Sequence, residues 1–501
     1  METLVNTKQA AYIDSSIQSS YKISSMLLME RAASAVYEVI SDKGLLGRGL
    51  TFGILCGNGN NSGDGLAIAR QLFMSSEKVL VYMTGRQADM SDSATRQYSM
   101  VKELGIFQSA FIDEFSECDV IIDALFGIGL SRNIEGDLRL LIDKINTFKA
   151  LKIAIDMPSG IDSATGSVMG TAFKADFTIT FGYKKTGQLL DPGRQYCGSI
   201  YDFNIGLNAE LIKNFAVKYY ALDKSDLTKC LSGRREDGNK STFGKVLIIA
   251  GSANISGAAF LSAKAALKSG CGMVRIYTAV ENRTILAGLL PEALIDTYDT
   301  DFKSEDLKKA CQWADIIVFG PGIGTGKNSS DMLNWLIKNT DLPLIIDADG
   351  LNLLAVDPER IDKYRGQVIL TPHMGEMCRL IQRPIDEIKK DRLNIAENFA
   401  MEHNAVVVLK DSVTVTAVPF KNTYLNTSGN SGLATAGSGD VLTGIIAALF
   451  VNKPDETSIA AAVYLHGRCA DEYAGRCNPI TMTASDIIDM LRPAIESDFQ
   501  K

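Results

Sequence analysis

The residues best suited to chemistry lie in the segment TSGNSGLATAGSGD, which ends in Gly437, Ser438, Gly439 and Asp440. An apolar helical pattern starts at Val441, so these residues stand at the N-terminus of a predicted helix. Consecutive backbone amides there can bind an anion, which phosphoryl transfer requires because charge spreads over the moving oxygens. Asp440 could accept a proton from an attacking hydroxyl. If Asp440 only capped the helix, the neighbouring glycines would have no purpose.

A second glycine-rich loop, GNGNNSGDG, runs from Gly57 to Gly65 between an apolar strand pattern and a helical one. Its glycines permit tight turns and close approach of a ligand. Asn60, Asn61 and Asp64 add convergent side-chain oxygens, which favours a binding site over a plain strand–helix turn. The loop is not the dinucleotide fingerprint, because Ser62 stands where that pattern requires glycine.

Polar residues also follow other predicted strands. In the first half they are Asp123 in DALFGIGL, and Asp156 with Ser159 in DMPSGID. A single aspartate at such a position is usually a cap or turn former. Because the carboxyl ends of parallel strands share one edge of a sheet, several together indicate a ligand site.

The second half has the same arrangement in the runs GPGIGTG, DADGLNLL, TPHMGE and KDSVT. His373 follows Pro372 at a strand end, so we expect it to contact a ligand. His403 and His466 lie in helical patterns, and we assign them to surface or core packing.

The elements that must position these residues alternate between strand and helix almost throughout. This alternation is typical of βαβ units, so we predict an α/β protein with parallel sheets. The pattern weakens between Asn208 and Thr242. We therefore predict two domains, residues 1–215 and 225–501, the first a Rossmann-like three-layer domain.

Composition narrows the possible functions. The 501 residues include 51 Lys and Arg and 59 Asp and Glu, for a net charge of −8, which argues against nucleic acid or an anionic membrane as partner. No apolar run approaches the length of a membrane span, and the N-terminus lacks a signal-peptide pattern. The nine scattered cysteines indicate a reduced compartment, so we expect a cytoplasmic protein. Three histidines nearly exclude a histidine-based zinc site.

The motifs of the first half, together with MERA at residues 29–32 and FGYKKTG, resemble the NAD(P)H-hydrate epimerase family over about residues 1–210. The resemblance implies a potassium ion held by Asn61, Asp123 and Ser159. It implies Asp156 as the acid/base group and a basic position at Lys185 whose role is open. The implied contacts to the hydrated cofactor are Asn60, Asn61, Ser62, Gly63, Asp64, Gly127, Ile128, Gly129, Leu130, Ser131, Arg132, Asn133 and Asp156. Ser62 and Met157 depart from the family's usual Gly and Ile.

The second half is similar to the ribokinase-like fold, and in particular to ADP-dependent NAD(P)H-hydrate dehydratases, over about residues 235–495. The resemblance implies Asp440 as catalytic base and Mg²⁺ as cofactor. Residues implied to face the hydrated cofactor are Gly257, Gly322, His373 and Asp440. Those implied to bind the adenine nucleotide are Lys410, Asp411, Ser412, Val413, Thr414 and Gly439. Met374 and Gly350 replace a common Pro and a common Ala.

Together the two resemblances imply repair of hydrated NADH and NADPH. The first domain would interconvert the R and S hydrates, and the second would dehydrate the S epimer through a phosphorylated intermediate, using ADP or ATP. The alternative is a ribokinase-like small-molecule kinase with a non-catalytic N-terminal binding module, since the GSGD site alone serves both chemistries. We expect a homo-oligomer, as is usual for such families.

Overall fold

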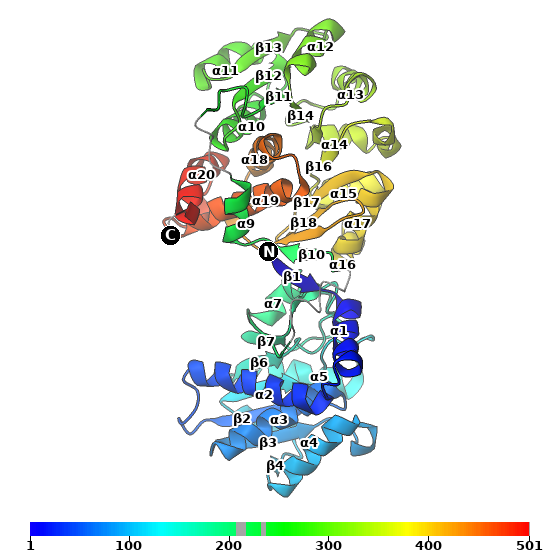
Figure 1. The fold of residues 1–501 in the computed structure, drawn as a ribbon, viewed down its shortest axis with the longest axis vertical. Helices are drawn as coiled ribbons and strands as arrows, with labels where there is room; N and C mark the ends of the chain where they lie inside the picture. Colours follow the sequence, from blue (N-terminus) through cyan, green and yellow to red (C-terminus); the bar gives the residue numbers. More distant parts are fainter. Residues whose placement is uncertain (207–216, 232–236, 500–501) are drawn as a thin grey trace. The chain divides into compact units, whose positions relative to one another are not determined.

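The computed structural model describes residues 1–206, 217–231 and 237–499. Its contacts separate two compact units, one formed by Thr3–Val217 and the other by Met1–Glu2 with Lys218–Lys501 (Figure 1). The division falls in the stretch where the sequence pattern weakens. The predicted domain end at residue 215 lies outside the described residues. Two α/β units with parallel sheets confirm the predicted fold class.

The first unit is built on a sheet of order β4-β3-β2-β5-β6-β7-β9, and every neighbouring pair in it is parallel. Buried Ile, Val and Ala side chains form cores on both faces of this sheet, as a three-layer domain requires. The strands are β2 Thr51–Cys56, β3 Lys78–Met83, β4 Phe107–Gln108, β5 Val120–Ala124, β6 Leu151–Ile155, β7 Phe177–Phe181 and β9 Ser199–Phe203.

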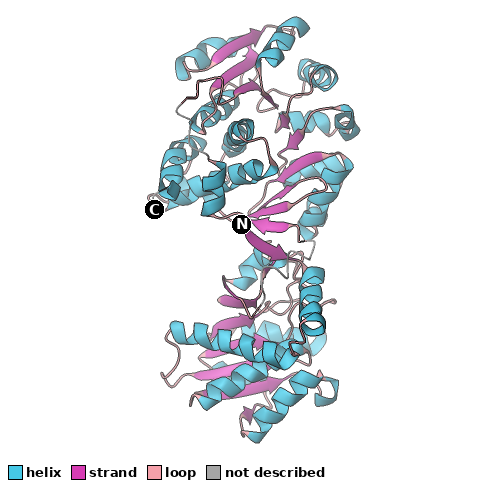
Figure 2. Ribbon diagram, in the orientation of Figure 1, coloured by secondary structure: helices cyan, strands magenta, loops and turns pink. Residues whose placement is uncertain are grey.

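Helices cover this sheet (Figure 2), and a short parallel pair of strands lies outside it. The helices are α1 Thr7–Ser20, α2 Ser25–Asp42, α3 Asn60–Met74, α4 Asp92–Glu103, α5 Gly136–Asn146, α6 Thr186–Leu189 and α7 Gly193–Cys197. The parallel pair joins β1 (Glu2–Val5) to β8 (Lys184–Lys185), with Val5 opposite Lys185. This pairing brings the start of the chain beside a lysine that the sequence analysis left without a role.

The second unit has a longer sheet of order β13-β12-β11-β14-β15-β16-β17-β18-β19-β10. Neighbours from β13 to β17 are parallel, but β17–β18 and β18–β19 are antiparallel, because short turns rather than helices connect them. The strands are β10 Tyr219–Ala221, β11 Lys245–Ile249, β12 Met273–Ala279, β13 Leu294–Tyr298, β14 Ile316–Phe319, β15 Leu344–Ile346, β16 Val368–Leu370, β17 Ala405–Leu409, β18 Thr414–Ala417 and β19 Thr423–Asn426.

The helices of this unit alternate with its parallel strands and cover the sheet (Figure 2). They are α9 Lys224–Cys230, α10 Gly257–Lys268, α11 Arg283–Leu289, α12 Ser304–Trp313, α13 Lys327–Asn339, α14 Asp349–Leu354, α15 Met374–Ile381, α16 Ile385–Lys390, α17 Arg392–Glu402, α18 Ser438–Asn452, α19 Glu456–Ala474 and α20 Ala484–Phe499. None of the helices in the described ranges combines the length and hydropathy needed to cross a membrane.

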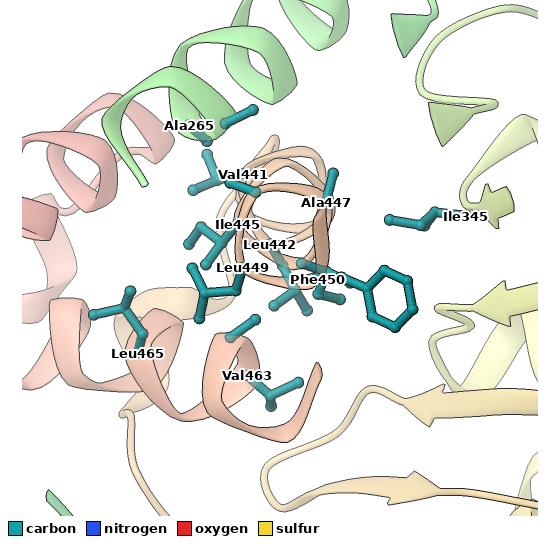
Figure 3. Close-up of a cluster of buried hydrophobic side chains, with 14 of the residues drawn as sticks. Ala265, Ile345, Val441, Leu442, Ile445, Ala447, Leu449, Phe450, Val463 and Leu465 are labelled. Atoms are coloured by element: carbon teal, nitrogen blue, oxygen red, sulfur yellow. The ribbon is translucent and has the colours of Figure 1, made fainter. Parts of the chain in front are cut away.

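The helix α18 lies at the centre of the second unit's core (Figure 3). It is apolar on all sides, which is typical of a fully buried helix. Its side chains, including Val441 and Phe450, lie among residues of α10, α19 and β15, such as Ala265, Val463 and Ile345. Because this packing surrounds α18, the GSGD turn at its N-terminus has a fixed position.

Candidate active sites

The first unit contains an open pocket of about 800 Å³ at the carboxyl ends of its strands. A smaller cavity of about 120 Å³ shares several of its lining residues, among them Asn60, Asp64 and Asp156. Asp14 of α1 lines both, and nothing in its helical sequence pattern indicated a site. The topology thus brings the glycine loop after β2 and the aspartate after β6 to one pocket, as expected for a parallel sheet.

Asp156 is held in an unusual backbone conformation by a buried network. Its φ of 64° is rare for a residue with a side chain and is maintained only by surrounding contacts. Lys185 Nζ forms an ion pair with Asp156 Oδ1 and also donates to Thr180 Oγ1 at 2.8 Å. Gln188 Nε2 donates to the carbonyl oxygen of Asp156 at 2.7 Å. The side chain of Lys185 is 4% exposed, so this ion pair is largely shielded from water.

Asp64, at the same pocket, has a different electrostatic environment. Desolvation raises the pKa of Asp64 well above its usual value, and the nearby charges of Asp156 and Asp14 raise it further. Asp156 and Asp64 thus differ at one pocket, since Asp156 is paired with a lysine and Asp64 favours the protonated form.

Two of the three predicted potassium ligands are in direct contact, and the third, Asn61, lines the pocket. Asp123 is fully buried, and its oxygens accept hydrogen bonds from Ser159 Oγ and Ser159 N, both at 2.7 Å. Burial raises the pKa of Asp123 to about 6, although the bonds from Ser159 oppose the shift. The side chain of Asn61 borders Gly127, where an added methyl group would lie 3.4 Å from Asn61 Oδ1. The Nδ2 atom of Asn61 is buried without a hydrogen-bond partner.

These residues fit a monovalent cation, because their side chains offer hard oxygen donors and one buried negative charge. The unpartnered Nδ2 of Asn61 supports the fit, because turning the side-chain amide over would put Oδ1 in the place of Nδ2, where the oxygen could bind the ion. No such ion is needed to explain the fold of the strands themselves.

The remaining predicted contacts of this unit divide into two groups. Residues of the glycine loop and of the segment after β5 line the larger pocket, namely Asn60, Asn61, Asp64, Gly127, Ile128, Gly129 and Leu130. Ser131, Arg132 and Asn133 are not among its lining residues. Ser62 and Gly63 are buried in the first turn of α3, where a methyl group on Gly63 would lie 2.6 Å from Met29 Cε. Their side-chain positions are therefore packed inside the protein, and contact through their backbone amides stays a prediction.

In the second unit a partly buried lysine connects the strand ends. Lys410, after β17, forms an ion pair with Asp347 Oδ1 at 2.9 Å, and Thr443 of α18 donates to Asp347 Oδ2 at 2.7 Å. Burial alone would lower the pKa of Lys410, but the charges of Asp347 and Glu376 raise it overall. Asp347 lies in a motif noted in the sequence, whereas nothing in the sequence marked Thr443.

Asp440 lies beside this ion pair at the start of α18. Burial and the charge of Asp347 raise the pKa of Asp440 to about 7, although Lys410 opposes the shift. Burial likewise raises the pKa of Glu376 to about 7. The N-cap of α18 is Gly437, and no side chain caps it, so Asp440 does not act as a helix cap. A carboxylate with a pKa near neutrality is suited to accepting a proton.

The glycines before Asp440 bring backbone amides close to the lysine. A methyl group on Gly439 would lie 3.3 Å from Lys410 Nζ and 3.9 Å from Asp347 Oδ2. Ser438 N donates to Thr435 O, and Val441 N donates to Gly437 O. The amides of Gly439 and Asp440 lie between these two bonds at the helix N-terminus, where amides lack intrahelical acceptors. The site thus offers free donors beside a cation.

Gly257 and Gly322 also come together. A methyl group on Gly322 would lie 3.0 Å from Ala258 Cβ and 2.7 Å from Ile255 Cγ2, so this loop packs against the start of α10. No atom would lie within 4 Å of a methyl group on Gly257, which therefore borders open space.

Other predicted residues have structural roles that the sequence did not show. His373 is the N-cap of α15, and its Nδ1 accepts a hydrogen bond from Gly375 N at 2.9 Å. Asp411 forms an ion pair with Arg392 at 2.5 Å, and Val413 is fully buried. Val413 can thus contact a nucleotide only through its backbone, whereas the side chain of Asp411 pairs with Arg392 and is still partly exposed.

The structure also brings His466 to the GSGD turn. His466 of α19 is buried, and its Nε2 lies 3.1 Å from Ser438 O and 3.2 Å from Ser438 Oγ. The sequence indicated only a helical position for this residue. The contact depends on the packing of α19 against α18, which no local pattern reveals. His403, by contrast, contacts Asp362 and packs on Phe399.

No group of three acidic, histidine or cysteine side chains that could hold a metal ion is found in the described part of the chain. Magnesium at such sites is usually bound through one or two carboxylates together with the phosphates of the nucleotide.

The two units thus define a protein with two separate α/β active sites, the second of the ribokinase-like class. Residues 246–493 match the family model for NAD(P)H-hydrate dehydratase, and residues 25–187 match the model described as YjeF-related protein N-terminus. A solved ribokinase-like superfamily protein from Enterococcus faecalis V583 is 29% identical, with a TM-score of 0.50. The match covers 56% of this chain and 97% of that one.

Relatives that match nearly the whole chain identify the family. The bifunctional NAD(P)H-hydrate repair enzyme of Thermofilum pendens is 33% identical over 97% of this chain and 96% of its own length. That of Escherichia coli is 33% identical over 89% of this chain and 85% of its own length. The chain belongs to the family of bifunctional NAD(P)H-hydrate repair enzymes, with an epimerase unit followed by an ADP-dependent dehydratase unit. The small-molecule kinase alternative is not favoured.

Proposed function

We propose that Asp440 is the catalytic base of the dehydration. The observation that carries the proposal is its raised pKa of about 7 at a helix N-terminus, beside the Lys410–Asp347 pair. Asp440 would take the proton of the hydroxyl on the hydrated nicotinamide ring, and the hydroxyl oxygen would attack the terminal phosphoryl group of the nucleotide. The amides of Gly439 and Asp440 and the ammonium of Lys410 stabilise the developing charge.

Phosphorylation turns a poor leaving group into a good one. The lone pair of the ring nitrogen expels phosphate and forms a carbon–nitrogen double bond. Loss of a proton from the adjacent ring carbon then restores the dihydronicotinamide. Magnesium bound with the nucleotide would neutralise phosphate charge. Gly257, Gly322 and His373 would contact the hydrated cofactor. The segment from Lys410 to Thr414 would contact the adenine nucleotide.

In the first unit we propose Asp156 as the acid/base group of epimerisation and Lys185 as its partner. Epimerisation inverts the carbon that bears the hydroxyl, so a bond to that carbon must break and form again with proton transfer. The buried Lys185–Asp156 pair at the pocket supports this role. Asn61, Asp123 and Ser159 would hold a potassium ion, which would add positive charge near the bound cofactor's phosphates.

A single assay tests both activities. Purified protein receives mixed epimers of hydrated NADH with magnesium, potassium, and ADP or ATP, while the absorbance of reduced nicotinamide is followed. We expect recovery of both epimers, dependent on nucleotide and accompanied by phosphate release. Recovery that stops at the fraction of one epimer would contradict the epimerase assignment. A stable phosphorylated product without recovery would contradict the dehydratase assignment.

We also propose a cytoplasmic, homo-oligomeric enzyme. All nine cysteines are free thiols in the structure, which suits a reducing compartment. Light scattering of the purified protein tests the oligomeric state, and a monomer at working concentration would contradict it.

A further inference from the structure

The helix α19 contacts both ends of the segment that leads into α18. At one end Ser428 Oγ donates to the carbonyl oxygen of Tyr464 at 2.9 Å, and Asp471 Oδ2 accepts from Gly429 N at 2.9 Å. At the other end His466 contacts Ser438. A methyl group on Gly467 would lie 2.2 Å from Ser428 Oγ, so the helix and the segment are in close contact.

The His466 contact involves both oxygens of Ser438. The carbonyl oxygen of Ser438 can only accept, so we assign the ring hydrogen to Nε2, which donates to that carbonyl, rather than to the tautomer in which Nε2 accepts from Ser438 Oγ. Burial, together with the charge of Lys410, lowers the pKa of His466 to about 4. The ring is therefore neutral at physiological pH, with its proton on Nε2, and the contact does not change with protonation near neutrality.

This hydrogen bond adds to the helical geometry of α18, which begins at Ser438, in holding the direction of the next amide. The carbonyl of Ser438 and the N–H of Gly439 belong to one planar trans peptide, so they point in opposite directions. Holding the carbonyl toward α19 therefore turns the Gly439 N–H away from α19. A methyl group on Gly439 would lie 3.3 Å from Lys410 Nζ, which places this residue on the side of the proposed phosphoryl site.

We propose that His466 is a positioning residue for the dehydration, which holds the Ser438–Gly439 peptide so that the Gly439 amide faces the phosphoryl group. Asp471 fixes the other end of the same segment. The inference rests on the proposed roles of Asp440 and Gly439, and it adds a residue that does not touch the reacting atoms.

Two conservative substitutions of His466 differ in reach. In His466→Gln the side-chain NH₂ extends about as far as Nε2 and can donate to Ser438 O, whereas in His466→Asn it extends only about as far as Nδ1. We expect His466→Asn to lower kcat for dehydration by roughly 10- to 100-fold, since it misaligns one anion-hole donor. KM for ADP should change less than about threefold, because such donors act mainly on the transition state. His466→Gln should recover most of kcat.

Matched controls separate positioning from folding. His403→Asn removes another buried histidine of the same unit, one that contacts Asp362 rather than the GSGD turn, and should leave kcat unchanged. Epimerisation by the first unit should be unaffected in every variant. Thermal unfolding of His466→Asn and His466→Gln should give similar midpoints.

Equal kcat in His466→Asn and the unsubstituted protein would overturn the proposal, as would an equal loss in the Asn and Gln variants. A loss confined to KM for ADP would also overturn it. The proposed function is tested separately, because Asp440→Asn should lower dehydration by about 10³-fold whether or not His466 matters.

Discussion

The two active sites use their aspartates in opposite ways. In the first unit the lysine binds the proposed acid/base group itself, since Lys185 pairs with Asp156. In the second unit Lys410 pairs with Asp347, and the proposed base Asp440 lies beside that pair. The difference shows in the pKa of Asp440, which is raised to about 7 because burial and the charge of Asp347 outweigh Lys410.

This comparison explains how similar side chains suit different reactions. The ion pair with Lys185 orients the carboxylate of Asp156. A buried carboxylate beside another carboxylate gains proton affinity, which suits a base that must abstract a proton from a hydroxyl near neutral pH. The two sites therefore differ in whether the lysine pairs with the proposed catalytic aspartate or with the aspartate beside it.

The largest effect is expected for Asp440→Asn, which removes the proposed base without changing the size of the side chain. Dehydration should fall by about 10³-fold, within the range for loss of a general base. Epimerisation, measured in the same sample by the ratio of the two hydrates, should not change. Parallel loss of both activities would contradict separate sites.

Asp156→Asn should have the opposite pattern, with epimerisation lowered by about 10²-fold and dehydration of the S hydrate unchanged. It should also destabilise the first unit by about 3 kcal/mol, because it leaves the buried ammonium of Lys185 without its charged partner. Denaturant unfolding measures this loss. Asp156→Asn combined with Lys185→Met should recover part of the stability but no epimerisation, and recovered activity would show that the pair is not catalytic.

The pH dependence of dehydration should distinguish Asp440 from its neighbour. The base must be deprotonated, so kcat/KM should fall about tenfold per pH unit below a midpoint near pH 7. The raised pKa also means that the contribution of Asp440 to stability is greatest below its unfolded value near 4 and is lost as pH rises through 7. Asp440→Asn should flatten that decline. Glu376→Gln is the control and should leave the pH midpoint of activity unchanged. If the pH dependence disappeared in this variant, the pKa near 7 would belong to Glu376.

The smallest effect is expected at the proposed potassium site. Asn61→Ala should raise the potassium concentration for half-maximal epimerisation several-fold, because Asp123 and Ser159 remain to bind the ion. Titration with potassium chloride at constant ionic strength measures this change. An unchanged midpoint would exclude Asn61 as a ligand. Dehydration in the same preparation serves as the control for non-specific salt effects.

Much of this arrangement could be predicted from local sequence. The apolar strand pattern before the GNGNNSGDG loop forms β2, Thr51–Cys56, because a short apolar run that ends at a glycine loop is typical of a buried strand. The sequence analysis predicted parallel sheets and missed the antiparallel pairing of β17 with β18. The apolar pattern of a strand such as β18 does not depend on the direction in which the strand runs.

The sequence by itself determined the two α/β units, the glycine loops and the aspartates at strand ends, because these depend on periodicity and turn chemistry over a few residues. Only the tertiary structure decided that Lys185 pairs with Asp156, that Lys410 pairs with Asp347, and that His466 contacts the GSGD turn. Each of these contacts joins segments far apart in the chain, and whether a charge is paired or free depends on distance in space, which spacing along the sequence does not encode.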